Sequence, residues 1–154
     1  MSTQGNTGID ITMKSIGEIR SDVKEPSKPG WEKGLISEIV LDSSLVEFTE
    51  GLEEFSHIIV IFWMHKISPQ RDVPSRIHPR GRQDLPLVGL FATRAPMRPN
   101  PIGISVVKLV ESQGNVLKVE GLDALDGTPV IDIKSYLPNN QVKDARFPGW
   151  VYRL

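Results

Sequence analysis

The 154-residue sequence contains no cysteine. This absence excludes disulfide bonds and every zinc site that uses thiolate ligands. No apolar run approaches the roughly 20 residues that cross a bilayer, and the polar residues 1–10 lack the basic and apolar regions of a signal peptide. We therefore expect a cytoplasmic protein without membrane association. Its length favours a single domain over residues 1–154, with residues 1–10 disordered.

Lysine is missing from residues 71–100, although the whole chain has as many lysines as arginines. The same stretch holds arginine at six positions: Arg71, Arg76, Arg80, Arg82, Arg94 and Arg98. Arginine without lysine suits bidentate recognition of phosphate or carboxylate groups. A solvated polar loop is the competing interpretation, and the pattern alone leaves both open.

Metal-ligand spacing is also absent. His57 and His65 share one face of a predicted strand but are eight residues apart, and His78 falls in a loop, so we expect no metal site. We expect His57 to be a core or interface residue and His65, at a strand end, to belong to a site. The sequence has neither a glycine-rich phosphate loop nor a dinucleotide fingerprint. Any nucleotide-like cofactor must be held without a Rossmann unit.

Most of the remaining sequence alternates as β-strands do. The strongest strand, residues 56–66, is apolar on both faces and so should be central or covered by a partner. Gln113-Gly114-Asn115 predicts a hairpin. Further strands are predicted at residues 11–19, 31–41, 87–93, 102–111, 116–120 and 130–137.

One helix is predicted from Ser44 and Glu47, which have capping-box spacing, and Gly51 should bend or end it. Many short strands with little helix favour a mainly β fold, a small single-domain antiparallel β-barrel with one or two short helices. The long polar loop at residues 67–85 is of a length that is usually functional or mobile.

Residues 88–105 hold the first candidate ligand site. Pro96, Pro99 and Pro101 fix the backbone and remove donors, so Arg94 and Arg98 should project from a stiff bend. Side chains held in this way lose little entropy on binding.

The segment from Leu125 to Pro138 is the second candidate. Asp126-Gly127 predicts a tight turn, and the strand after it should place Asp132, Lys134 and Tyr136 on one face, with Ile131 and Ile133 in the core. The three polar side chains either orient a polar substrate or form an exposed charge ladder. The turn is equally compatible with no chemistry.

Three motifs together resemble the TsaA/VirR-like family. They are Gly-Leu-Glu-Glu-Phe-Ser-His (residues 51–57), Phe-Ala-Thr-Arg-x-Pro-x-Arg-Pro-Asn-Pro-Ile-Gly (residues 91–103) and Leu-Asp-Gly-Thr-Pro-Val-x-Asp-Ile-Lys-x-Tyr-Leu-Pro (residues 125–138). The resemblance extends over residues 16–152. It implies a compact β-barrel that binds S-adenosylmethionine, usually as a homodimer.

Carried onto this sequence, the resemblance implies a set of cofactor-binding residues. They are His65, Lys66, Arg94, Ile104, Asp126, Gly127, Thr128 and Pro129. Pro26-Ser27-Lys28 matches a further family contact only in part. Arg94 and the backbone N–H groups of Gly127 and Thr128 are the expected hydrogen-bond donors.

The best-known family members methylate N6 of threonylcarbamoyladenosine in tRNA. The same activity here would use Asp132 or Tyr136 as a proton acceptor or orienting group. Arginine side chains would contact phosphates of the anticodon stem-loop, namely Arg71, Arg76, Arg80, Arg82 and Arg98. The longer members add a C-terminal domain, which we do not expect in this protein. We therefore keep two alternatives open, namely a small-molecule or protein acceptor and a non-catalytic regulator that binds S-adenosylmethionine or RNA.

Overall fold

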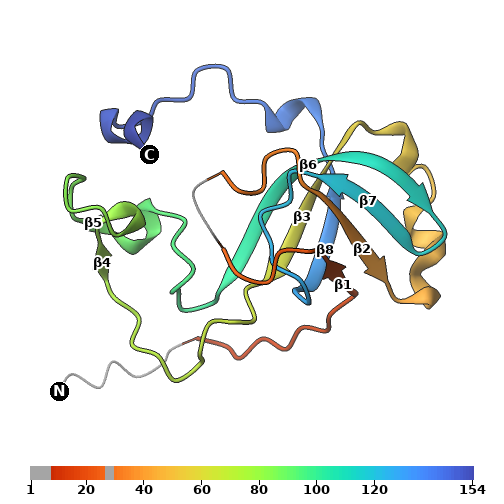
Figure 1. Cartoon of the computed structure of the whole chain (residues 1–154), viewed down its shortest axis with the longest axis horizontal. Helices are drawn as coiled ribbons and strands as arrows, with labels where there is room; N and C mark the ends of the chain where they lie inside the picture. Colours follow the sequence, from red (N-terminus) through yellow and green to blue (C-terminus); the bar gives the residue numbers. More distant parts are fainter. Residues whose placement is uncertain (1–7, 27–29) are drawn as a thin grey trace.

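The chain folds around a closed antiparallel barrel in a computed structural model that describes residues 8–26 and 30–154. Within these ranges the barrel has six strands, in the spatial order β1-β2-β7-β6-β3-β8 (Figure 1). Their bounds are β1 Gly17–Arg20, β2 Ile36–Leu41, β3 His57–Trp63, β6 Ile102–Gln113, β7 Val116–Glu120 and β8 Pro129–Ser135. Closure pairs every strand on both sides, which removes exposed edges. The predicted fold class is confirmed.

Strand β3 is central, as its two-sided apolar pattern predicted. It pairs with β6 on one side and β8 on the other. Ile58, Val60 and Phe62 point into a core in which each is at most 4% exposed. The strand pattern thus identifies the core correctly, but His57 is exposed, so it is not a core residue, and its place in an interface stays a prediction.

The core is aliphatic except for Phe62, and it is supplied by all six barrel strands and by the segment after β7. Its buried members are Ile19, Ile39, Leu41, Ile58, Val60, Phe62, Val107, Leu117, Val119, Leu122, Ala124 and Val130. In β8 the register shifts between Ile61 and Phe62 of the partner strand, so Val130 faces Phe62 and is fully buried. Ile131 was predicted to face the core, but at this bulge Val130 takes the inward position in its place. Ile133 does pack against the core, as predicted.

The segment predicted to be helical is helical, in the 3-10 form. The segment forms two 3-10 turns, η1 (Ser43–Thr49) and η2 (Leu52–Glu54), and Asp42 caps the first by accepting a hydrogen bond from the Ser44 N–H. Gly51 separates the turns with φ of 84°, a conformation that favours glycine. Phe48, within η1, is 81% exposed and does not join the core.

Between β3 and β6 the chain leaves the barrel. This excursion (residues 67–101) contains a small ribbon of β4 (Arg76–Ile77) and β5 (Val88–Gly89) and two 3-10 turns, η3 (Pro79–Gly81) and η4 (Leu90–Ala92). The predicted strand at residues 87–93 is therefore mostly wrong, since the chain turns after Gly89 so that Leu90 is buried and its N–H donates to the Ser75 carbonyl.

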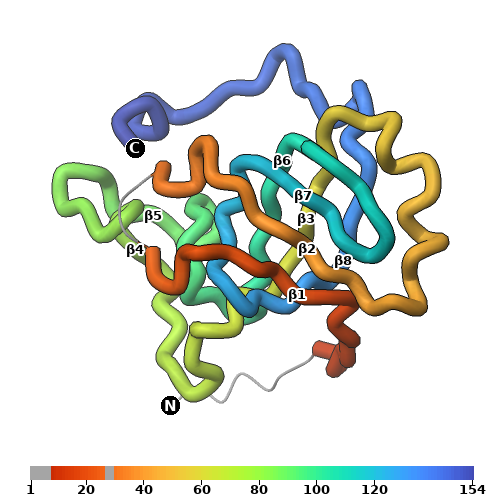
Figure 2. Tube along the Cα trace, turned by 45° about the vertical axis from the view of Figure 1, so that its right-hand side comes forward, coloured from red at the N-terminus to blue at the C-terminus, as the bar shows by residue number. Residues whose placement is uncertain are grey.

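The C-terminal segment returns to the excursion. After β8, turn η5 (Pro138–Asn140) leads into an extended stretch, and η6 (Gly149–Arg153) lies near β4 and β5 in both views (Figures 1 and 2). Arg82 donates a hydrogen bond to the Arg153 carbonyl, which anchors this end. The strand predicted at residues 11–19 begins only at Gly17. Of residues 1–10, which were expected to be disordered, residues 1–7 lie outside the described ranges.

Candidate functional site

Two adjoining hollows lie at the end of the barrel where the excursion departs. The loop hollow, about 420 Å³, is bordered by the end of β3, the proline bend and the segment before β8. The β6 hollow, about 490 Å³, follows the first residues of β6. Each volume falls within the range of small-ligand pockets. Phe62, Met64, Arg94 and Asp123 line both hollows and form their shared wall.

The two candidate segments meet in the loop hollow. Arg94 and Pro96 of the proline bend form one side, while Leu125 and Thr128, which flank the Asp126-Gly127 turn, form another. Stretches about 30 residues apart in sequence are thus brought to a single hollow by the closure of the barrel. His65 and Lys66, directly after β3, also line it.

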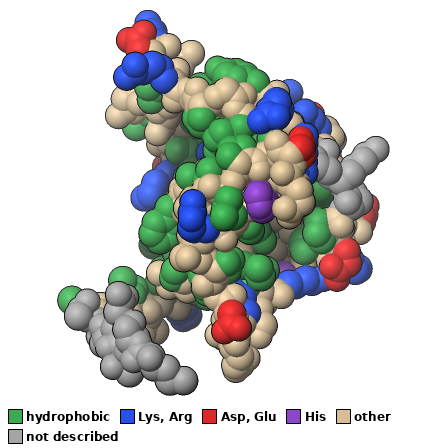
Figure 3. Space-filling view, turned by 90° about the vertical axis from the view of Figure 1, so that its left-hand side faces the viewer, with side chains coloured by type: hydrophobic (Ala, Val, Ile, Leu, Met, Phe, Trp, Pro, Cys, Tyr) green, Lys and Arg blue, Asp and Glu red, His purple; other side chains and the backbone are tan. Residues whose placement is uncertain are grey.

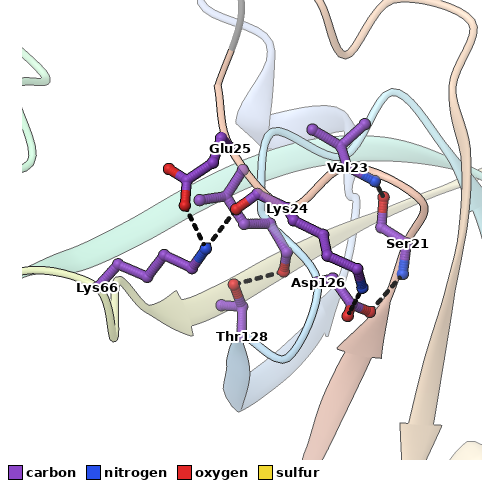
Figure 4. Close-up of polar contacts among 8 residues, drawn as sticks. Ser21, Val23, Lys24, Glu25, Lys66, Asp126 and Thr128 are labelled. Atoms are coloured by element: carbon purple, nitrogen blue, oxygen red, sulfur yellow. Dashed lines mark hydrogen bonds and ion pairs between the residues drawn. The ribbon is translucent and has the colours of Figure 1, made fainter.

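A polar network fastens the wall of the loop hollow (Figure 4). The Asp126 carboxylate accepts from the Lys24 ammonium at 2.6 Å and from the Ser21 N–H at 3.0 Å. The Lys66 ammonium donates to Glu25 at 2.9 Å and to the Lys24 carbonyl. The segment after β1 is therefore held against both the turn before β8 and the end of β3. Ser27 and Lys28, which continue this segment, lie outside the described residues.

Electrostatics within this network follow from the Lys24–Asp126 pair. Hydrogen bonding to Lys24, reinforced by the Ser21 N–H, holds the pKa of Asp126 below its usual value. The hydrogen bond to Asp126 raises the pKa of Lys24. Both groups are therefore charged over a wide pH range.

The Asp126-Gly127 turn has a different role from the predicted one. The Gly127 N–H donates to the Ile19 carbonyl at 2.8 Å, and the Thr128 N–H donates to the Leu125 carbonyl at 3.2 Å. These donors are therefore engaged within the chain rather than directed at a ligand. Gly127 has φ of 78°, which is why glycine is needed at the turn. Neither Asp126, Gly127 nor Pro129 lines a hollow, whereas Thr128 does.

Arg94 is the cation available to a ligand. Its side chain lines both hollows, and within residues 8–26 and 30–154 no hydrogen bond or ion pair holds its guanidinium. Ile104 lines the β6 hollow, beside the shared wall, and is 53% exposed.

Three of the arginines predicted to bind RNA have hydrogen-bond or ion-pair partners within their own chain. Arg71 donates to the carbonyls of Ser68 and Arg98, which ties the long loop to the proline bend. Arg98 does not project outward, because its guanidinium folds back onto the Thr93 and Ala95 carbonyls at 2.9 and 3.0 Å. Arg82 pairs with Asp84 at 2.6 Å.

Arg76 and Arg80 are the exposed members of the group, and in the described part of the chain no hydrogen bond or ion pair engages them. The positive charge of Arg80 lowers the pKa of Asp123, although Arg80 lines neither hollow. Figure 3 faces the end of the molecule with β4 and β5, and shows separate groups of Lys and Arg side chains around exposed hydrophobic surface.

Asp132 and Tyr136 are not brought to the hollows. Strand β8 runs away from the site, so Asp132 faces Ile61 and the Tyr136 ring lies against His57 at 6.3 Å between centroids. Asp132 forms a 2.9 Å ion pair with Lys134 of the same strand, so the charges pair along β8 and not across strands as a charge ladder would require. The His57 ring is hydrogen-bonded to Ser56 at 2.8 Å.

Two acidic residues of the β6 hollow were missed from the sequence, Glu32 and Asp123. Desolvation raises the pKa of Asp123, Glu32 raises it further, and Arg80 and Arg94 oppose the shift. The only signal for Asp123 was its place three residues before the Asp126-Gly127 turn.

In the described part of the chain, no group of three or more metal-ligating side chains occurs, and no helix is long and apolar enough to span a membrane.

Fold and site together define a small antiparallel barrel with a ligand hollow built by loops at one end. Residues 17–142 match the family described as the tRNA-methyltransferase O N-terminal domain, and the chain belongs to this family. A protein of Pyrococcus abyssi described as a probable S-adenosyl-L-methionine-binding protein is 42% identical over 145 residues, which cover 92% of this chain and 76% of that protein.

Two further relatives are longer than this chain. The tRNA (adenine(37)-N6)-methyltransferase of Escherichia coli is 40% identical over 135 residues, covering 81% of this chain and 57% of that protein. The crystal structure of TrmO from Pseudomonas aeruginosa superposes with a TM-score of 0.70 at 36% identity, covering 90% of this chain and 62% of that chain. The match thus spans somewhat less than two thirds of each of these proteins.

Proposed function

We propose that this protein is an S-adenosylmethionine-dependent methyltransferase that methylates N6 of threonylcarbamoyladenosine next to the anticodon in tRNA. The observation that carries the proposal is the loop hollow, in which the proline bend and the segment before β8 face each other. Membership of the tRNA-methyltransferase O family supports the reaction. The tRNA substrate also implies a cytoplasmic location.

The residues of the loop hollow fit the donor chemically. Arg94 offers an unengaged cation for the donor's carboxylate, and Trp31, Phe62 and Met64 offer apolar surface for its adenosyl group. His65, Lys66 and Thr128 complete the proposed lining, while Asp126, Gly127 and Pro129 shape it from behind. Ile104 would meet the donor across the shared wall.

Positioning is the main task of these side chains. When bound, S-adenosylmethionine supplies a methyl group on a positively charged sulfur, which is transferred by in-line displacement. Arg94 orients the donor, and the Lys66–Glu25 and Lys24–Asp126 pairs keep the wall in place. The acceptor enters from the side of the shared wall.

RNA contact is assigned to the unengaged arginines. Arg76 and Arg80 are exposed on the excursion and can meet the phosphates of an anticodon stem-loop. We also propose that two copies of the chain associate, as the resemblance of residues 16–152 to the TsaA/VirR-like family implies. Sedimentation of the purified protein tests the association, which a monomer at all concentrations would refute.

Two measurements test the function. Calorimetric titration with S-adenosylmethionine should show binding, and Arg94→Ala should weaken it, with exposed Arg146→Ala as the matched control. Mass spectrometry of tRNA nucleosides from cells lacking the protein should show methylated threonylcarbamoyladenosine only after the active protein is added. Binding without methylation of tRNA would reject the tRNA acceptor and favour another acceptor or a regulator. The absence of both would reject the cofactor as well.

A further inference from the structure

The wall shared by the two hollows contains a carboxylate. Asp123 follows β7 and lines both the loop hollow and the β6 hollow. Among the described residues common to the two linings, the others are Phe62, Met64 and Arg94, so Asp123 is the only acid there. A group at this position faces the donor on one side and the acceptor on the other.

Methylation at N6 of threonylcarbamoyladenosine calls for a base. The nitrogen is bonded to a carbonyl carbon and to the purine ring, and its lone pair is delocalised into both. A neutral N–H of this kind is a poor nucleophile. Withdrawal of its proton during attack returns the electron pair to nitrogen, which is the role of a general base.

We propose that Asp123 is this catalytic base, and that the β6 hollow holds the acceptor adenine with its N6–H donating to the Asp123 carboxylate. The new bond forms between N6 and the methyl carbon while the carbon–sulfur bond breaks. The electron pair of the broken bond goes to sulfur, which becomes a neutral thioether, and the N6 proton passes to Asp123. This inference rests on the proposed function.

The surroundings of Asp123 suit proton transfer. Its carboxylate makes no hydrogen bond or ion pair within the described ranges, and its backbone N–H donates to the Ser105 hydroxyl at 3.4 Å, which links it to β6. Desolvation and Glu32 raise the pKa of Asp123, with Arg80 and Arg94 opposing. A carboxylate with a raised pKa accepts a proton more readily than an ordinary one.

The other candidate acids are engaged elsewhere. Asp126 is held by Lys24 and Ser21, and Asp132 is paired with Lys134 and accepts from the Ile133 N–H. Neither lines a hollow. Of the acids that do, Glu25 is paired with Lys66, and Glu32 lines only the β6 hollow and so lies outside the shared wall. Asp123 therefore has both the position and the free acceptor oxygens that the reaction requires.

The experiment compares Asp123→Asn with Asp123→Glu and Asp132→Asn. Single-turnover methylation of an anticodon stem-loop RNA that contains threonylcarbamoyladenosine is followed across a pH series. We expect Asp123→Asn to slow transfer about 100-fold or more, to remove the acid limb of the pH profile, and to leave the Kd for S-adenosylmethionine within about threefold. Asp123→Glu should restore part of the rate.

A second readout needs no turnover. The carboxyl carbon signal of Asp123 in ligand-free protein, identified by its loss in Asp123→Asn, should titrate at the midpoint of the acid limb. If Asp123→Asn keeps the rate and the limb, or if Asp132→Asn loses both instead, the assignment of the base is wrong and the proposed function stands. If the wild-type protein binds S-adenosylmethionine but methylates no RNA, the proposed function and this inference both fail.

Discussion

The Lys24 ammonium lies 2.6 Å from the Asp126 carboxylate, and this ion pair joins positions 102 residues apart in the chain. One partner belongs to the segment after β1 and the other to the turn before β8. With Ser21 and Lys66, the pair fixes one wall of the loop hollow (Figure 4). Neutralising either partner of the Lys24–Asp126 pair should therefore weaken binding of S-adenosylmethionine.

The first prediction concerns acid conditions. Because the pKa of Asp126 is depressed in the folded protein, the pair stabilises the fold above the pKa of an unfolded aspartate, and this contribution is lost as pH falls through the depressed value. At high pH the contribution is lost as pH rises through the raised pKa of Lys24. Asp126→Asn should weaken S-adenosylmethionine binding only a few-fold, since solvent screens an exposed ion pair.

Calorimetry and thermal unfolding across a pH series check this expectation. As pH falls, the affinity for S-adenosylmethionine and the unfolding temperature should decrease less in Asp126→Asn than in the wild-type protein. Asp144→Asn, at an exposed position of the C-terminal segment, is the matched control. Equal acid profiles for wild-type and Asp126→Asn proteins would show that the pair does not support the wall.

The second prediction separates free from engaged arginines. Arg76→Ala and Arg80→Ala should each weaken binding of an anticodon stem-loop RNA and reduce the slope of log Kd against log salt by about one unit per lost phosphate contact. Arg82→Ala should leave the slope unchanged, because its guanidinium already pairs with Asp84. Fluorescence anisotropy at several salt concentrations measures the Kd for RNA and so the salt slope of each variant. A reduced slope for Arg82→Ala and unchanged slopes for the other two would reverse the assignment.

Much of the barrel could be predicted from the sequence because its strands alternate clearly. The two-sided apolar pattern of residues 56–66 indicated a central strand, and the Gln113-Gly114-Asn115 turn and β7 were confirmed. Gly114 has φ of 60°, as a tight hairpin needs. These features depend on local sequence, and local sequence was sufficient for them.

The excursion and the shared wall were not predictable in the same way. Arg98 reads as a projecting side chain next to prolines, yet three-dimensional closure of the bend brings carbonyls of Thr93 and Ala95 within its reach. Nothing in the sequence distinguishes Asp123 from the other acidic residues. It lines both hollows only because β6, β7 and the proline bend meet there in the folded chain. Such relationships arise from contacts between distant segments, which alternation patterns do not encode.

The third prediction tests the packing beneath the hollows. Gly103 faces Phe62 across the β3–β6 pair, and a methyl group at Gly103 would overlap the Phe62 ring. Gly103→Ala should therefore destabilise the fold by about 1–3 kcal/mol, as overpacking does. Gly89→Ala is the control, because a methyl group there meets nothing within 4 Å. Denaturant unfolding of both variants measures the difference, and equal stability would mean that the ring moves aside at no cost.

The last prediction concerns Glu32, the acid that lines the β6 hollow with Asp123. Its negative charge raises the pKa of Asp123, so Glu32→Gln should lower that pKa. Since a base acts only when deprotonated, the acid limb of the methylation profile should then shift to lower pH. Arg80→Ala removes an opposing charge and should shift the limb to higher pH. Opposite shifts in these two variants, measured by single-turnover kinetics, would tie the limb to Asp123, whereas an identical limb in both would assign it to a group outside the shared wall.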